Sequence, residues 1–274
     1  YAPVQRGGAG ADNLAERLRK VLGASAETDL GLARVLAYAG YGNVILGEYF
    51  CESPVADDQP ALDSNQLLAR GIERFDEVIR IATAAKAARP ASAATADTLI
   101  HLARVGAARA ALQRGDKAKA IEYASQVPAA FTFWLNYSET KSYQENRLFA
   151  ASNGSGRYIG VSAKFRGLND PRVRHNATAQ SGHSPDAILY TPRLGTSHTG
   201  FSTAAAGNFA KTTGIRLASG LEAQYILAEA QGVNAANLAF VNSRRAVGGA
   251  AALAATVAPA DFEAAVRDQR RRDF

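Results

Sequence analysis

The sequence is poor in the residues that carry most recognisable chemistry. Its 274 residues include no methionine, one cysteine, one tryptophan and four histidines. The single cysteine, Cys51, excludes an internal disulfide and has no neighbours at the spacing of metal ligands. Because Cys51 lies close to Tyr49, Phe50 and Val55, we expect its thiol to be buried and inert.

Long hydrophobic runs are also missing. No stretch reaches the ~18 consecutive apolar residues that indicate a membrane span. The chain begins with tyrosine rather than methionine. We therefore expect a processed or trimmed product from which any export signal has already been removed.

The charge of the chain is not concentrated in one region. The net charge is +6, but Lys and Arg are scattered, apart from a short run at residues 270–272. No basic stripe is interleaved with aromatic residues, so we expect no nucleic-acid partner. Hydrophobic residues make up 47% of the chain and charged residues 20%, which favours a globular protein over a disordered one.

No catalytic or metal-binding pattern is present in the sequence. The histidines His101, His175, His183 and His198 do not pair at helical spacing, and no HExxH or Cys/His grouping occurs. We interpret the last three as exposed loop residues and His101 as a helix-surface or satisfied core residue. No nucleophile elbow, Walker loop or dinucleotide fingerprint is found either. The prediction is a protein without metal or cofactor that is not an enzyme.

Helical periodicity dominates the first half of the chain. Apolar spacing predicts helices over 12–23, from a cap at Asp29 toward Phe50, and over 65–86, where the 3.6-residue stripe is clearest. A further helix follows Pro90, and Gly115 with Asp116 provides a helix stop and a new helix cap. A joint this short forces an antiparallel hairpin. The pattern predicts TPR-like antiparallel helix pairs.

The character of the sequence changes between residues 129 and 214. Ser, Thr, Gly and Asn become frequent there, and helical periodicity is lost. Short extended segments are possible at 157–161 and 187–190, and 153–156 is interpreted as a turn. Helical signal returns at about 217. We predict one domain over 1–274, with a helical part (1–128), an irregular loop-rich insertion that faces a ligand (129–214) and returning helices (215–274).

Aromatic residues cluster at the start of the irregular segment. Their flat faces can stack on sugar rings, while neighbouring Asn and Ser bind hydroxyl groups. Trp134, Tyr137 and Tyr143 are the predicted ligand-binding residues. For Phe131 and Phe133 the favoured interpretation is that they seal the end of a helix pair.

Six stretches, read in order, resemble the SusD/RagB family of outer-membrane nutrient-binding lipoproteins. They cover nearly the whole chain, although members of the family are usually longer and carry an N-terminal lipid-bearing cysteine that is not seen here. The stretches are LARVLAYAGYGNVILGEYFCESP (32–54), LLARGIERFDEVIRIA (67–82), ARVGAARAALQRGDKAKAIEYASQVP (103–128), NDPRV (169–173), LEAQYILAEA with FVNSRRAVGG (221–230 and 240–249), and VRDQRRRDF (266–274).

The resemblance implies a SusD-like α-superhelix at the outer face of a Gram-negative outer membrane. It implies capture of an oligosaccharide or similar nutrient and delivery to a TonB-dependent, SusC-like transporter, without catalysis. Membrane attachment is implied only through a lipid anchor. The alternative is a helical-repeat scaffold, or an accessory subunit of a cell-surface assembly, because TPR-like pairs commonly bind proteins. The ligand and the oligomeric state are left open.

Overall fold

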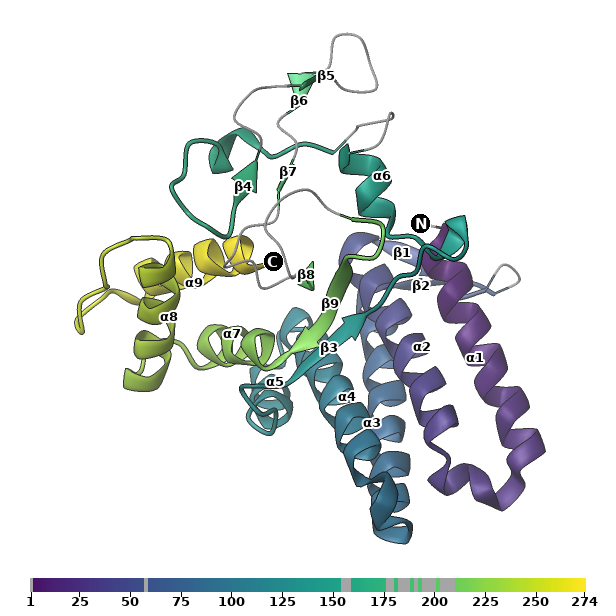
Figure 1. The fold of residues 1–274 in the computed structure, drawn as a ribbon. Coiled ribbons are helices and arrows are strands. Elements are labelled where there is room, and N and C mark those ends of the chain that lie inside the picture. Colours follow the sequence, from purple (N-terminus) through teal and green to yellow (C-terminus); the bar gives the residue numbers. More distant parts are fainter. Residues whose placement is uncertain are drawn as a thin grey trace. The chain divides into compact units, whose positions relative to one another are not determined.

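A computed structural model describes residues 2–56, 59–153, 159–175, 180–181, 188–189, 192–193, 201–202 and 210–274 (Figure 1). The chain forms two compact units. Unit 1 contains residues 1–133 and 218–231, and unit 2 contains residues 134–217 and 232–274. The chain therefore leaves unit 1 after residue 133, builds most of unit 2, returns to unit 1 for one short segment (218–231), and then ends in unit 2.

Unit 1 is a stack of helices in which each helix packs against the next along the chain. Helix α7 returns from later in the sequence and packs on α4 and α5. A two-stranded antiparallel hairpin, β1 with β2, connects α2 to α3. The elements are α1 (Ala2–Leu22), η1 (Gly23–Thr28), α2 (Leu30–Tyr49), β1 (Glu52–Pro54), β2 (Ala61–Asp63), α3 (Ser64–Ala88), η2 (Pro90–Ser92), α4 (Ala93–Gln113), α5 (Lys117–Ala124) and α7 (Gly220–Gln231). This mainly α architecture confirms the predicted fold class.

Side-chain caps set the starts of α2, α3 and α5 in unit 1. Asp29 accepts the Leu32 N–H at 2.7 Å and so caps α2. Asp116 accepts the Lys119 N–H at 3.0 Å and starts α5. Gly115, at φ 79°, supplies the left-handed residue that ends α4. The predicted hairpin of α4 and α5 around this joint is confirmed.

The core of unit 1 depends on small residues that let helices approach closely. Phe75 of α3 is fully buried between Gly40 of α2 and Gly106 of α4. A Cβ atom at Gly106 would lie 2.3 Å from the Phe75 ring, and one at Gly40 would lie 2.7 Å from it. Tyr41 packs edge-on against the same ring, with the centroids 5.1 Å apart. The two glycines thus make the slot that Phe75 fills.

The exposure of Cys51 differs from the prediction. Cys51 is exposed rather than buried. Helix α2 ends at Tyr49, whose side chain is 72% exposed, and the chain turns outward before β1. The aromatic neighbours in the sequence therefore do not cover the thiol in the fold.

The boundaries of two helical regions also differ from prediction. Helix α1 begins at Ala2, ten residues before the predicted start, because its glycine-rich first half contacts α2, with Gly8 against Gly42. Residues 217–219 belong to strand β9 (Gly214–Ser219), so the later helices begin only at Gly220. The strand carries the chain back into unit 1, where the Gly220 N–H donates to the Phe131 carbonyl at 2.8 Å.

Unit 2 combines short strands with three helices among its described residues. Strand β9 lies between β3 and β8 in a small sheet, and two further two-stranded ladders, β4 with β7 and β5 with β6, are antiparallel. The helix α6 falls inside the segment predicted to be irregular. The elements are β3 (Thr132–Leu135, shared with unit 1), η3 (Ser142–Gln144), α6 (Arg147–Asn153), η4 (Ala163–Phe165), β4 (Arg174–His175), β5 (Gln180–Ser181), β6 (Ile188–Leu189), β7 (Pro192–Arg193), β8 (Phe201–Ser202), β9 (also shared with unit 1), α8 (Ala235–Val247) and α9 (Pro259–Asp273).

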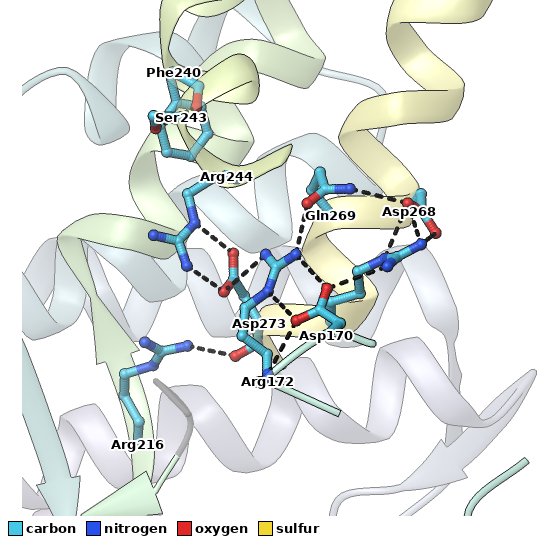
Figure 2. Close-up of polar contacts among 10 residues, drawn as sticks. Asp170, Arg172, Arg216, Phe240, Ser243, Arg244, Asp268, Gln269 and Asp273 are labelled. Carbon is cyan, nitrogen blue, oxygen red and sulfur yellow. Dashed lines mark hydrogen bonds and ion pairs between the residues drawn. The ribbon is translucent and has the colours of Figure 1, made fainter. Parts of the chain in front are cut away.

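A buried network of ion pairs joins the loop before β4 to helices α8 and α9 (Figure 2). The Arg172 side chain, which is fully buried, donates to Asp170 at 2.7 and 3.0 Å and to Gln269 at 2.8 Å. Asp273 lies 3.3 Å from Arg172 and accepts two hydrogen bonds from Arg244, at 2.5 and 2.8 Å. Because removal of one partner would leave a buried charge uncompensated, this network fixes the loop firmly.

Candidate ligand-binding site

The three predicted aromatic residues lie in unequal surroundings within unit 2. Trp134 is half-buried in β3. Tyr137 is half-buried just beyond that strand and lines a cavity. Tyr143, in η3, is 70% exposed. Trp134 and Tyr143 are not among the residues that line this cavity, so only Tyr137 joins it, and the binding role of all three stays a prediction.

The cavity beside Tyr137 has a volume of about 220 Å³. Helix α6 supplies one wall, Ile215 of β9 another, and Ile159 is held against α6 by a hydrogen bond from its N–H to the Ala151 carbonyl at 3.2 Å. The lining residues are Tyr137, Asn146, Arg147, Leu148, Ala151, Ile159 and Ile215. Hydrocarbon walls with few polar groups are typical of small-molecule sites, but this volume lies below the roughly 300–1,000 Å³ of such sites, so the cavity can take only a small part of a larger ligand.

Asn146 organises the floor of the cavity. It is 1% exposed, and its side-chain amide donates to the Thr213 carbonyl at 2.5 Å and accepts the Leu148 N–H at 2.8 Å. Its backbone N–H donates to the Lys211 carbonyl at 2.7 Å. These hydrogen bonds hold residue 146 next to residues 211–213, so the two ends of the intervening segment lie side by side. Asn146 could not be identified from the sequence, because its partners Lys211 and Thr213 lie more than sixty residues away.

The electrostatics of the cavity favour a neutral phenol beside one cation. Burial raises the pKa of Tyr137 further above its ordinary value, and its neutral hydroxyl can donate a hydrogen bond. Arg147 is exposed at the start of α6 and is the charged member of the lining. The arrangement offers an aromatic face, an apolar wall and hydrogen-bonding groups, which together suit the C–H face and hydroxyl groups of a sugar ring.

The histidines do not gather into a site in the described part of the chain. His101 lies on α4 with its ring centroid 5.4 Å from that of Phe131, and burial lowers its pKa. Phe131 thus packs against the helix pair, in line with its predicted sealing role. His175 is in β4, and His183 and His198 lie outside the described residues. Across the described ranges, no group of three His, Cys, Asp or Glu side chains could hold a metal ion.

The fold resembles those of known SusD-like proteins. A SusD-like carbohydrate binding protein from Bacteroides vulgatus ATCC 8482 aligns with a TM-score of 0.57 and 16% identity over 96% of this chain. A SusD/RagB family protein from Bacteroides thetaiotaomicron VPI-5482 aligns with a TM-score of 0.57 and 14% identity over 98% of the chain. A SusD-like protein from Bacteroides fragilis NCTC 9343 aligns with a TM-score of 0.55 and 12% identity over 95% of the chain.

These similarities concern structure and not sequence. No protein-family model matches the chain, and no curated protein matches it. The chain spans 65% and 66% of the length of the first two structures and 70% of the third. It has a SusD-like fold, which confirms the resemblance drawn from its helical stretches.

No helix among the described residues is long and apolar enough to cross a membrane.

Proposed function

We propose that the chain captures an oligosaccharide or a similar nutrient at the cell surface and passes it to a TonB-dependent, SusC-like transporter. It acts as a binding protein and not as an enzyme. The SusD-like fold is the observation that carries this proposal, and one of the similar structures is a carbohydrate binding protein. The cavity beside Tyr137 supports it, because that cavity combines an aromatic face with hydrogen-bonding groups.

The proposed location is the extracellular face of a Gram-negative outer membrane, with attachment through a lipid anchor. A transporter in the same membrane then receives the ligand directly. Co-purification of the chain with a large TonB-dependent receptor from the same cells tests this partnership. Recovery of each protein without the other, under mild detergent extraction, would count against the delivery step.

Ligand capture is tested by thermal unfolding in the presence of a panel of neutral oligosaccharides. A ligand that binds only the folded state stabilises it by about 2.7 kcal/mol at roughly one hundred times its Kd. We expect at least one glycan to raise the Tm, and Tyr137→Ala to reduce that shift. Trp134→Ala and Tyr143→Ala determine whether the other two aromatic residues also contribute.

Tyr49→Ala is the matched control, since Tyr49 is an exposed tyrosine of unit 1, outside the candidate site. Its ligand-induced shift should equal that of the unaltered chain. If no glycan of the panel moves the Tm of the folded protein, glycan capture is wrong and the helical-repeat scaffold becomes the better interpretation.

A further inference from the structure

Unit 2 contains a second, more polar cavity that lies apart from the aromatic cluster of the sequence. Its volume is about 350 Å³, and it is formed by the loop that leads from η4 into β4. The cavity lining has no aromatic side chain except the imidazole of a histidine, and it shares no residue with the cavity beside Tyr137. The lining residues are Leu168, Asn169, Asp170, Pro171, Val173, Arg174 and His175.

The loop around this cavity is anchored from behind. Asp170 and Arg172 are buried, and the Arg172 guanidinium reaches Gln269 and Asp273 of α9 (Figure 2). Gly248, at the end of α8, lies so close that a Cβ atom there would be 2.4 Å from the Asp170 carboxylate. The backbone that shapes the cavity is therefore positioned before any ligand arrives, which lowers the entropic cost of binding.

The negative charge of the Asp170 carboxylate is compensated by neighbouring arginines. Its oxygens accept hydrogen bonds from the Arg172 side chain at 2.7 and 3.0 Å and from Arg272 at 3.1 Å. Arg172 also pairs with Asp273, and Arg272 also pairs with Asp268. Asp170 therefore belongs to a network in which acidic and basic side chains balance. A carboxylate this well paired neither attracts a metal ion strongly nor repels an anion strongly.

Arg174 is the cation that the network does not use. It is exposed on β4 and lines the cavity, and its side chain has no ion pair or hydrogen bond with any part of the chain that the structure describes. The antiparallel register of β4 and β7 sets position 193, also an arginine, directly opposite position 174.

We propose that this cavity binds the carboxylate of an acidic sugar, with Arg174 as the residue that recognises the charge. A planar guanidinium matches a carboxylate with two parallel hydrogen bonds. The exposed Asn169 amide can bind neighbouring hydroxyl groups, and the hydrocarbon of Leu168 and Val173 can face the ring. The choice of an oligosaccharide as the ligand rests on the proposed function, whereas the choice of an anion rests on this cavity.

The test is calorimetric titration of the whole chain with tetragalacturonate and with its fully methyl-esterified form, which is neutral. We expect the acid to bind about tenfold tighter than the ester, because a hydrogen bond to a charged group is lost with the ester. Arg174→Gln should abolish that difference, and Arg174→Lys should keep part of it. A higher salt concentration should weaken the binding of the acid and not that of the ester.

Arg114→Gln is the matched control, since it removes one exposed arginine from unit 1 and should leave both affinities unchanged. Equal affinity of acid and ester, or an unaltered preference in Arg174→Gln, overturns the proposal. Equal affinity for a sulfated oligosaccharide of the same length and charge overturns the assignment of a carboxylate. Binding of neutral glycans alone leaves the proposed function standing while this inference fails.

Discussion

Single residues show most clearly how tightly unit 1 is packed. Gly106 has an ordinary helical backbone, so its glycine is required by the space that Phe75 occupies and not by its conformation. Gly106→Ala should lower the free energy of unfolding by about 1–2 kcal/mol, because overpacking outweighs the better helix propensity of alanine. Urea denaturation measures this change through the midpoint.

A glycine in open surroundings provides the control for that substitution. A Cβ atom added to Gly10 of α1 would have nothing within 4 Å of it. Gly10→Ala should therefore raise stability by up to about 1 kcal/mol. If both substitutions stabilise the protein, the slot for Phe75 is not as tight as these distances indicate.

The charge state of Asp170 makes the stability of unit 2 depend on pH. Burial alone would raise the pKa of this carboxyl, but hydrogen bonds from Arg172 and Arg272 outweigh burial and lower the pKa to about 2. The unfolded chain then binds the proton more readily than the folded chain. The stabilisation is present above pH ~4 and is lost as the pH falls toward 2, and it amounts to about 2 kcal/mol.

Asp170→Asn isolates this contribution. The variant should be less stable than the unaltered chain at pH 7, and this gap in unfolding free energy should narrow as the pH falls from about 4 toward 2. Chemical denaturation at several pH values, followed by a signal from unit 2, measures the gap. A gap that does not change with pH would mean that the carboxyl keeps its ordinary pKa in the folded protein.

At the scale of elements, helix α5 shows how much a cap contributes. It has only eight residues, which is too short to be stable alone in water. Asp116→Ala removes the acceptor for the Lys119 N–H and should cost about 1 kcal/mol of unfolding free energy. Asp116→Asn keeps a cap and should cost much less. Equal losses in thermal unfolding would show that charge and not capping is responsible.

The segment between residues 146 and 213 depends on a different kind of contact. Asn146→Ala leaves the buried Thr213 carbonyl and the Leu148 N–H without their side-chain partner, at a cost of about 1–3 kcal/mol. Hydrogen exchange at Leu148 should accelerate. In Asn146→Asp the new carboxylate still accepts the Leu148 N–H, so this amide should exchange more slowly than in the alanine variant. Unchanged exchange in the alanine variant would contradict this role of Asn146.

The contrast between these elements explains what the sequence could predict. The caps at Asp29 and Asp116 act over three residues, so local patterns are enough to find them. The cavity beside Tyr137 depends on Ile215, and Asn146 depends on Thr213, across separations that periodicity does not encode. Tyr137 was predicted from its residue type, whereas its position in a cavity needed the fold.

At the scale of the whole molecule, unit 1 is completed by a segment that is distant in the sequence. Helix α7 contributes Tyr225 and Ile226, which are fully buried, and Glu222, which lies 3.6 Å from Arg109. Arg109 also makes a two-pronged ion pair with Glu48, at 2.5 and 2.6 Å. Residues 1–133 alone would therefore expose apolar surface on α4 and α5 that α7 covers in the intact chain.

This dependence gives a prediction about minimal folding units. A polypeptide of residues 1–133 should unfold at a lower temperature than one in which a flexible linker of about six residues joins 133 to 218–231. The linker can be short because the Gly220 N–H bonds to the Phe131 carbonyl. Glu222→Leu in the linked polypeptide would separate the ion pair from apolar packing. Equal unfolding temperatures with and without α7 would mean that the first helices fold as a complete stack, and that the returning segment stabilises only itself.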